Sequence, residues 1–90
     1  MKNINPTIIL VRPQLPENIG MTARVMDNFG LSKLYIVNPR DGWPNQKALA
    51  TSVGAINILK KCEVFKETED AIKNIWFNAS LRYLSCRLLG

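Results

Sequence analysis

The chain has 90 residues, of which 47% are hydrophobic and 21% are charged, with five glycines and five prolines. This length suits one small domain, and the composition is typical of a packed core rather than of disorder. Histidine is absent, which excludes imidazole bases, Ser-His and Cys-His nucleophile pairs and most zinc chemistry. Cys62 and Cys86 lack metal-ligand spacing. We therefore expect two free thiols in a reducing compartment, with neither a metal nor a disulfide.

The positive charge is concentrated in the first two thirds of the chain. Residues 1–61 hold eight Lys and Arg against three Asp and Glu, whereas residues 62–90 hold four of each. Such a surface is compatible with a nucleic-acid partner, because Lys and Arg that neutralise phosphates release counterions, although many basic surfaces are only solvated. No apolar run is long enough for a membrane span or a signal peptide, so we expect a cytoplasmic protein.

The first half of the chain has the pattern of a strand, a helix and a second strand. Residues 7–11 (TIILV) form a β-branched apolar run typical of a strand that is covered on both faces. After a proline-containing loop we expect a helix from Asn18 to Phe29, with Asn18 as N-cap, a wide apolar arc and Gly30 at its end. Residues 33–37 (KLYIV) predict the second strand, parallel to the first across a right-handed crossover.

The second half continues the alternation of helices and strands. Asn45 is a good N-cap, and Gly54 is expected to end the helix that Asn45 begins. The predicted elements are a helix over 46–52, a strand over 62–65, a helix from 67 to about 74 and a fourth strand over 75–77. The alternation predicts an α/β fold built on a parallel sheet of βαβ units.

The domain is expected to occupy residues 1–80, followed by a divergent C-terminal tail over residues 81–90. In this tail Leu81, Leu84 and Leu88 fit one face of a short helix.

Arginines follow both strands of the predicted βαβ unit. Arg12 comes after the first strand and Arg40 after the second, at the sheet edge where ligands collect in open α/β sheets. The first helix starts at the same edge and carries Arg24 on its polar side. Gly20, one turn earlier, has no side chain and would let a sugar or a phosphate approach the backbone closely. These residues would suit a bulky anionic substrate.

The same residues carry a family resemblance. The stretch from Asn18 to Gly30 (NIGMTARVMDNFG), preceded by VRPQ at 11–14 and followed by LYIVNP at 34–39, resembles the first motif of the SpoU-type (SPOUT) RNA 2′-O-methyltransferases. It is most similar to the branch that methylates a ribose in a tRNA anticodon loop, and it covers roughly residues 7–75. The resemblance implies an α/β-knot fold, a homodimer, S-adenosylmethionine as methyl donor and RNA, here tRNA, as substrate.

The resemblance also implies residue roles. Asn18 and Arg24 match the family's catalytic motif, in which the arginine engages the phosphate beside the target ribose. Because a guanidinium is almost never deprotonated, we interpret Arg24 as a phosphate clamp rather than as a base. Arg12, Gly20 and Arg40 are candidate RNA contacts. The structural alternatives are an Arg24–Asp27 ion pair, a helix cap at Asn18 and a packing role for Gly20.

The chain departs from the family after residue 80. Family members hold the methyl donor with later motifs that thread the chain into a knot, and residues 81–90 do not resemble them. The knot segment is thus expected to be absent, the cofactor-binding residues are unknown, and we expect a fragment with little or no activity alone. The alternative is a small basic RNA-binding or scaffolding module without chemistry. The fragment is expected not to bind S-adenosylmethionine, and the module is expected to bind tRNA with an affinity that falls with salt and with Arg24→Ala.

Overall fold

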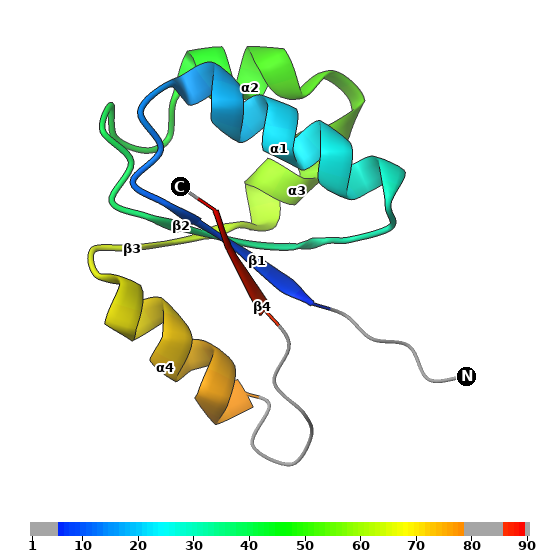
Figure 1. The fold of residues 1–90 in the computed structure, drawn as a ribbon. Coiled ribbons are helices and arrows are strands. Elements are labelled where there is room, and N and C mark those ends of the chain that lie inside the picture. Colours follow the sequence, from blue (N-terminus) through cyan, green and yellow to red (C-terminus); the bar gives the residue numbers. More distant parts are fainter. Residues whose placement is uncertain (1–5, 79–85, 90) are drawn as a thin grey trace.

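The computed structural model describes residues 6–78 and 86–89, which form a layered α/β structure (Figure 1). One sheet of four parallel strands has the order β3-β2-β1-β4. The strands are β1 (Thr7–Val11), β2 (Lys33–Val37), β3 (Glu63–Phe65) and β4 (Cys86–Leu89). The predicted α/β fold with a parallel sheet is confirmed, and β1 lies inside the sheet between β2 and β4.

Helices cover both faces of this sheet (Figure 1). On one face lie α1 (Pro16–Asn28), α2 (Gln46–Ser52) and α3 (Ile56–Lys61), with a short 3-10 helix, η1 (Val53–Ala55), between the last two. The other face carries α4 (Thr68–Asn78). None of the helices in the described part of the chain has both the length and the apolar character that a membrane span requires.

Alternate residues of the two inner strands, β1 and β2, point to opposite faces of the sheet and belong to two different hydrophobic cores. Ile8 and Leu10 of β1 belong to the core under α1 and α3, whereas Ile9, which is fully buried, packs with Tyr35 against α4. The Tyr35 hydroxyl donates a hydrogen bond to Oδ1 of Asn74 on α4. The continuous apolar run of residues 7–11 therefore has the predicted cause, a strand that is covered on both faces.

The N-terminus of α1 differs from the prediction. The helix begins at Pro16, whose fixed φ suits the first helical position, and the N-cap residue Leu15 makes no side-chain cap bond. The predicted N-cap role of Asn18 is thus wrong, and Asn18 lies exposed in the first turn. The other predicted cap is confirmed, because Oδ1 of Asn45 accepts hydrogen bonds from the backbone nitrogens of Lys47 (2.9 Å) and Ala48 (3.3 Å).

The segment after α2 also differs. The helix ends before Val53, whose φ is +51°, rather than at Gly54, and α3 was not predicted. Ile75–Phe77, predicted as a strand, belongs to α4. Ala71 and Ile75 are both buried against the sheet, and their spacing of four residues is that of one helix face. Such a short apolar run does not distinguish a strand from a buried helical turn.

The fourth strand lies instead within the segment that was expected to be a tail. Residues 86–89 pair in parallel with β1, so that Thr7 is opposite Cys86 and Leu10 is opposite Leu89. The predicted short helix is wrong at Leu88, which is part of β4. Leu81 and Leu84 lie outside the described residues.

Gly20 determines how closely α1 and α2 approach. A Cβ atom at this position would lie 2.6 Å from the carbonyl oxygen of Ala48, 2.6 Å from Cβ of Thr51 and 2.9 Å from the backbone nitrogen of Ser52. Two of these three atoms belong to the backbone of α2, so a small side-chain rotation cannot relieve the clash. The missing side chain therefore serves helix packing.

Replacing Gly20 by alanine should destabilise the fold. Overpacking typically costs about 1–3 kcal/mol, which outweighs the roughly 1 kcal/mol that alanine gains over glycine inside a helix. The matched control is Gly54→Ala, because an added Cβ there meets nothing within 4 Å. Urea unfolding monitored by circular dichroism should show a clear loss for Gly20→Ala and none for Gly54→Ala. Equal unfolding midpoints for the two variants would contradict this packing role.

Candidate functional site

The carboxyl ends of β1, β2 and β3 are aligned at one edge of the sheet. Val11 is level with Val37, and Val37 with Phe65. One residue further on, the nitrogen of Arg12 donates to the carbonyl of Val37 at 2.7 Å and the nitrogen of Asn38 donates to that of Phe65 at 2.8 Å. Arg12 and Asn38 are thereby fixed side by side, and both have a φ of +46°. This backbone conformation is uncommon outside glycine, and such residues concentrate at functional sites.

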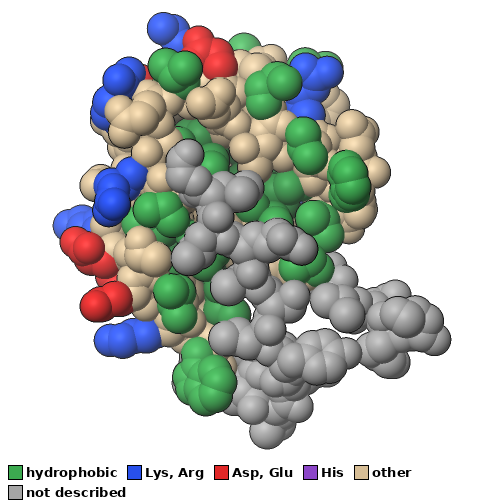
Figure 2. Space-filling view, in the orientation of Figure 1, with side chains coloured by type: hydrophobic (Ala, Val, Ile, Leu, Met, Phe, Trp, Pro, Cys, Tyr) green, Lys and Arg blue, Asp and Glu red, His purple; other side chains and the backbone are tan. Residues whose placement is uncertain are grey.

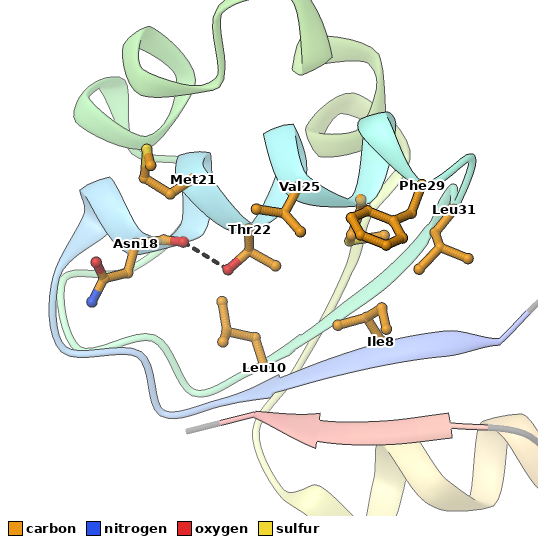
Figure 3. Close-up of a pocket in the computed structure, with 9 residues that line it drawn as sticks. Ile8, Leu10, Asn18, Met21, Thr22, Val25, Phe29 and Leu31 are labelled. Carbon is orange, nitrogen blue, oxygen red and sulfur yellow. Dashed lines mark hydrogen bonds between the residues drawn. The ribbon is translucent and has the colours of Figure 1, made fainter.

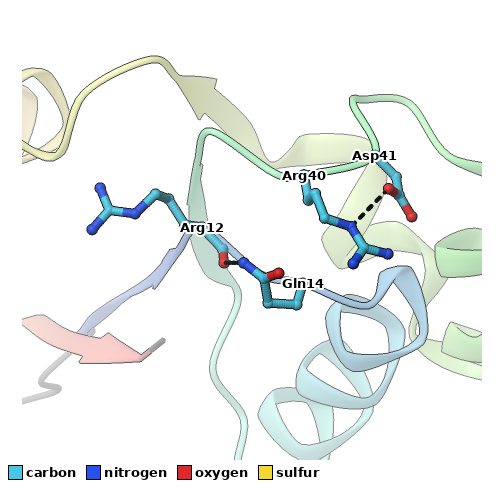
Figure 4. A network of polar contacts seen from close by, with 4 residues as sticks. All are labelled: Arg12, Gln14, Arg40 and Asp41. Carbon is cyan, nitrogen blue, oxygen red and sulfur yellow. Dashed lines mark hydrogen bonds and ion pairs between the residues drawn. The ribbon is translucent and has the colours of Figure 1, made fainter.

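The structure does not bring the two strand-end arginines together (Figure 4). The Arg12 guanidinium is exposed and extends away from Arg40. Nε of Arg40 lies 3.1 Å from Oδ1 of Asp41, which is the one ion pair among residues 6–76, whose side chains the structure describes. The loops themselves are linked, since the nitrogen of Arg40 donates to the carbonyl of Pro13 at 3.1 Å. Asp41 thus offsets the positive charge of Arg40, whereas the positive charge of Arg12 is exposed and is not offset by any described acidic side chain.

Arg12 also lies where the order of the strands reverses. From β1 the chain passes through α1 to β2 on one side, while β4, reached through α4 on the opposite face, lies on the other side of β1. Open α/β sheets bind ligands at such a switch point, beyond the carboxyl ends of the strands. The Arg12 guanidinium extends to the side on which β4 lies (Figure 4). Of the two strand-end arginines, Arg12 therefore has the position expected of an anion contact.

Arg24 is exposed on α1 and its side chain leans back along the helix. Nη1 of Arg24 lies 3.7 Å from Sδ of Met21, which is one turn closer to the carboxyl edge. This direction is usual for long helical side chains, which point toward the N-terminus of their helix. The alternative ion pair with Asp27 is not formed, because the described part of the chain has its single ion pair at Arg40 and Asp41. Arg24 is available to an external anion.

A cavity of about 490 Å³ lies between α1 and β1 (Figure 3). Asn18 is at one end and Phe29 at the other. Most lining residues are apolar, and the set consists of Ile8, Leu10, Asn18, Met21, Thr22, Val25, Met26, Phe29 and Leu31. The hydroxyl of Thr22 is already used, since it donates to the carbonyl of Asn18 at 2.8 Å. The Asn18 amide is the remaining polar side chain of this lining.

Met21 connects the cavity with Arg24, because its side chain lines the cavity and contacts the Arg24 guanidinium. Asn18 and Arg24 themselves are six residues apart in α1, so they lie about 120° apart around the helix axis. Gly20 lies on the side of α1 that faces α2. The expected approach of a sugar or a phosphate to its backbone is blocked, because α2 fills the space beside its Cα atom. The structure thus supports the packing alternative for Gly20.

The cavity was not predicted from the sequence. The apolar arc of the first helix was expected to pack as one face, but the structure divides it. Ile19, Ala23 and Met26 are buried, whereas Val25 is 54% and Phe29 76% exposed. An arc wider than one packed face was the signal that could have revealed the second surface.

Cys62 lies at the start of β3, at the opposite edge of the sheet, and is a free, half-buried thiol. Burial raises its pKa to about 11, the negative charge of Glu63 adds to this, and a backbone hydrogen bond acts in the opposite direction. The side chain of Cys86 lies outside the described part of the structure.

Comparison with known sequences identifies relatives of this chain. The sequence profile described as "SpoU rRNA Methylase family" matches residues 5–86. The tRNA (cytidine/uridine-2′-O-)-methyltransferase TrmJ of Sodalis glossinidius is 41% identical over 68 residues, which are 76% of this chain and 26% of that protein. The TrmJ of Pseudomonas aeruginosa, named for cytidine, uridine and adenosine, is 40% identical over 65 residues, covering 72% of this chain and 25% of that protein.

Comparison with solved structures identifies relatives of the same kind. TrmJ from Z. mobilis ZM4 superposes with a TM-score of 0.77 at 50% identity, over 80% of this chain and 32% of that one. A probable methylase family protein from Haemophilus influenzae superposes with a TM-score of 0.71 at 33% identity, over 77% of this chain and 29% of that one. This chain therefore spans about a quarter to a third of the length of the relatives that it matches.

The raised pKa of Cys62 predicts slow alkylation of the folded chain. With a pKa of about 11, about one thiol in a thousand is ionised at pH 8, against roughly a quarter for an ordinary cysteine of pKa near 8.5. Iodoacetamide labelling of a Cys86→Ser variant, followed by mass spectrometry, should be slow at pH 8, accelerate as the pH rises toward 11 and become fast in urea. Labelling at pH 8 as fast in the folded as in the unfolded chain would contradict the burial of this thiol.

Proposed function

Because this chain belongs to the SpoU rRNA Methylase family, we propose that it is the RNA-contacting, N-terminal portion of a tRNA ribose 2′-O-methyltransferase. The observation that carries the proposal is the pair of exposed arginines, Arg12 and Arg24, which have no acidic partner within the described residues. The names of the TrmJ relatives support tRNA as the partner. The homodimer, which the sequence resemblance implied, and the cytoplasmic location, which was expected from the lack of a long apolar run, belong to the same proposal.

In this proposal Arg24 binds the phosphate beside the target ribose. The planar guanidinium fork matches a phosphate in a bidentate manner, which positions the nucleotide and stabilises negative charge. Arg24 does not accept the proton of the 2′-hydroxyl, because a guanidinium remains protonated. A phosphate oxygen of the RNA is the acceptor that this arrangement offers. Arg12 contacts the RNA backbone at the edge of the sheet, and Arg40, already paired with Asp41, contributes less.

Asn18 completes the polar part of the proposed site. Its amide is exposed and makes no cap bond, so its donor and its acceptor are both available to a nucleotide. The structural alternative, a helix cap, would have occupied the amide oxygen. The difference between the predicted and the observed start of α1 therefore supports a substrate role for Asn18.

The family implies S-adenosylmethionine as methyl donor, and the described lining of the cavity between α1 and β1 does not fit this group. The donor carries a carboxylate, an ammonium, a sulfonium and ribose hydroxyls, each of which needs a polar or charged partner. Among the described residues, the lining of the α1–β1 cavity contains no charged side chain, and Asn18 is its one polar side chain that is not already bonded. We therefore propose that the 90-residue chain binds RNA and does not transfer a methyl group by itself.

A second candidate function is a basic RNA-binding module that takes no part in methylation. The described lining of the α1–β1 cavity, which offers the methyl donor no charged partner, favours considering it. Both functions require RNA binding, and they differ in whether the chain supports methylation once the rest of the relatives' domain is supplied. Methylation of tRNA in that mixture supports the first function, and its absence supports the second.

Binding of tRNA should depend on salt and on both arginines. Arg24→Ala and Arg12→Ala should each weaken binding and lower the slope of log K against log salt concentration by about 0.7–0.9, which is the value for one lost phosphate contact. The matched control is Lys73→Ala, because it removes the same charge from an exposed position on α4. Fluorescence anisotropy with labelled tRNA measures all three variants.

Two results would count against the proposed function. Absent or salt-independent tRNA binding would eliminate both candidates. An effect of Lys73→Ala as large as that of Arg24→Ala would show that only net charge matters and that α1 is not a specific contact.

A further inference from the structure

The chain leaves β2 at Asn38 in the same way that it leaves β1 at Arg12. Each of the two residues follows the last residue of its strand, has a φ of +46° and precedes a proline, Pro13 or Pro39. Residues before proline normally adopt extended conformations, and a positive φ is uncommon outside glycine. Both strand ends therefore hold a costly backbone conformation, and such conformations concentrate at functional sites.

Hydrogen bonds fix the backbone at this edge. The nitrogens of Arg12 and Asn38 each donate to a carbonyl of the neighbouring strand. In a parallel ladder the next donor to the Arg12 carbonyl would be the nitrogen of Pro39, which carries no hydrogen. The side-chain amide of Gln14 donates to that carbonyl instead, at 3.4 Å (Figure 4). The ladder between β1 and β2 therefore stops here, with Arg12 and Asn38 held side by side.

The side chain of Asn38 is exposed and makes no hydrogen bond to another residue in the described part of the chain. Its amide offers two donor hydrogens and an acceptor oxygen. The positive φ alone would account for an asparagine, because its short polar side chain tolerates the left-handed conformation. It does not account for Arg12, whose long side chain lacks this property. A ligand that contacts both residues accounts for both.

The two side chains suit different parts of a nucleotide. Lys and Arg side chains, with some acidic ones between them, lie along the side of the molecule on which the strands end, on the left in Figure 2. The exposed positive charge of Arg12 at this edge suits a phosphate. Neighbouring strands lie about 4.8 Å apart, so Asn38 is within reach of the ribose attached to that phosphate. A ribose 2′-hydroxyl is both donor and acceptor, and proteins use it to distinguish RNA from DNA.

We propose that Asn38 hydrogen-bonds the 2′-hydroxyl of the nucleotide whose phosphate Arg12 binds, and that this contact makes the carboxyl edge of the sheet selective for RNA over DNA. The inference rests on the proposed function, because it requires that RNA binds at this edge. The nucleotide concerned is held at the end of the strands, whereas the proposed target ribose lies beside the phosphate that Arg24 binds on α1. Asn38 is thus a specificity residue and does not act on the methyl group.

A comparison of two nucleic acids tests this contact. Fluorescence anisotropy measures binding of the 90-residue chain to a labelled RNA hairpin with the sequence of a tRNA anticodon arm, and to the same hairpin made of DNA. The unsubstituted chain should prefer RNA. Asn38→Gly should lower the RNA affinity by about three- to tenfold, the effect of one hydrogen bond, and the DNA affinity by less than about twofold. The slope of log K against log salt concentration should not change, because no charge is removed.

Glycine is the informative substitution at this position. It adopts a positive φ without steric cost, so the variant loses the amide while it keeps the backbone conformation. Circular dichroism confirms that the variant is folded. The matched control is Asn28→Ala, which removes an exposed amide from the last residue of α1, at the opposite edge of the sheet. This control should bind both hairpins as the unsubstituted chain does.

Three results would overturn the inference. The first is equal affinity of the unsubstituted chain for RNA and DNA. The second is an equal loss for both hairpins with Asn38→Gly, because the amide would then contact a base or a phosphate. The third is unchanged RNA binding of Asn38→Gly together with weakened binding of Arg12→Ala, which would leave the proposed function standing. Absence of binding to either hairpin would instead overturn the proposed function together with the inference that rests on it.

Discussion

The arrangement of this molecule depends on the pairing of β1 with a parallel strand on each side. All five of its residues pair with β2, and four pair with β4. A strand in this position has two faces to cover, which requires α1 on one side and α4 on the other. Its carboxyl end then emerges where the strand order reverses, so Arg12 leaves the sheet at the point where ligands collect.

The same geometry gives α1 two different tasks. Its inner side, with Ile19, Ala23 and Met26, closes the core, and Gly20 allows α2 to pack against its backbone. Its outer side carries the polar Asn18 and Arg24 and the apolar Met21, Val25 and Phe29. Met21 belongs to both outer groups, because it lines the cavity between α1 and β1 and contacts Arg24.

Sequence reasoning located the first βαβ unit because its signals are local. The β-branched runs, the Asn45 cap and the left-handed Gly30 each depend on a few neighbouring residues. The sequence did not predict those elements whose secondary structure depends on contacts between distant parts of the chain. Ile75 became helical because Ala71 and Ile75 together pack on the sheet, and residues 86–89 became a strand because β1 had an open edge beside it. Gly20 is a further example. Its sequence position is compatible with helix packing and with the approach of a ligand, and only the position of α2 in the structure distinguishes the two roles.

In the proposed function, RNA contacts the carboxyl edge of the sheet and the outer side of α1. Titration of the isotope-labelled chain with tRNA, followed by amide NMR shifts, tests it most directly. The shifts should be concentrated at Arg12, Asn38, Asn18 and Arg24, with α4 nearly unchanged. Shifts concentrated at Lys60 and Lys61, at the opposite edge of the sheet, or no shifts at all, would contradict it.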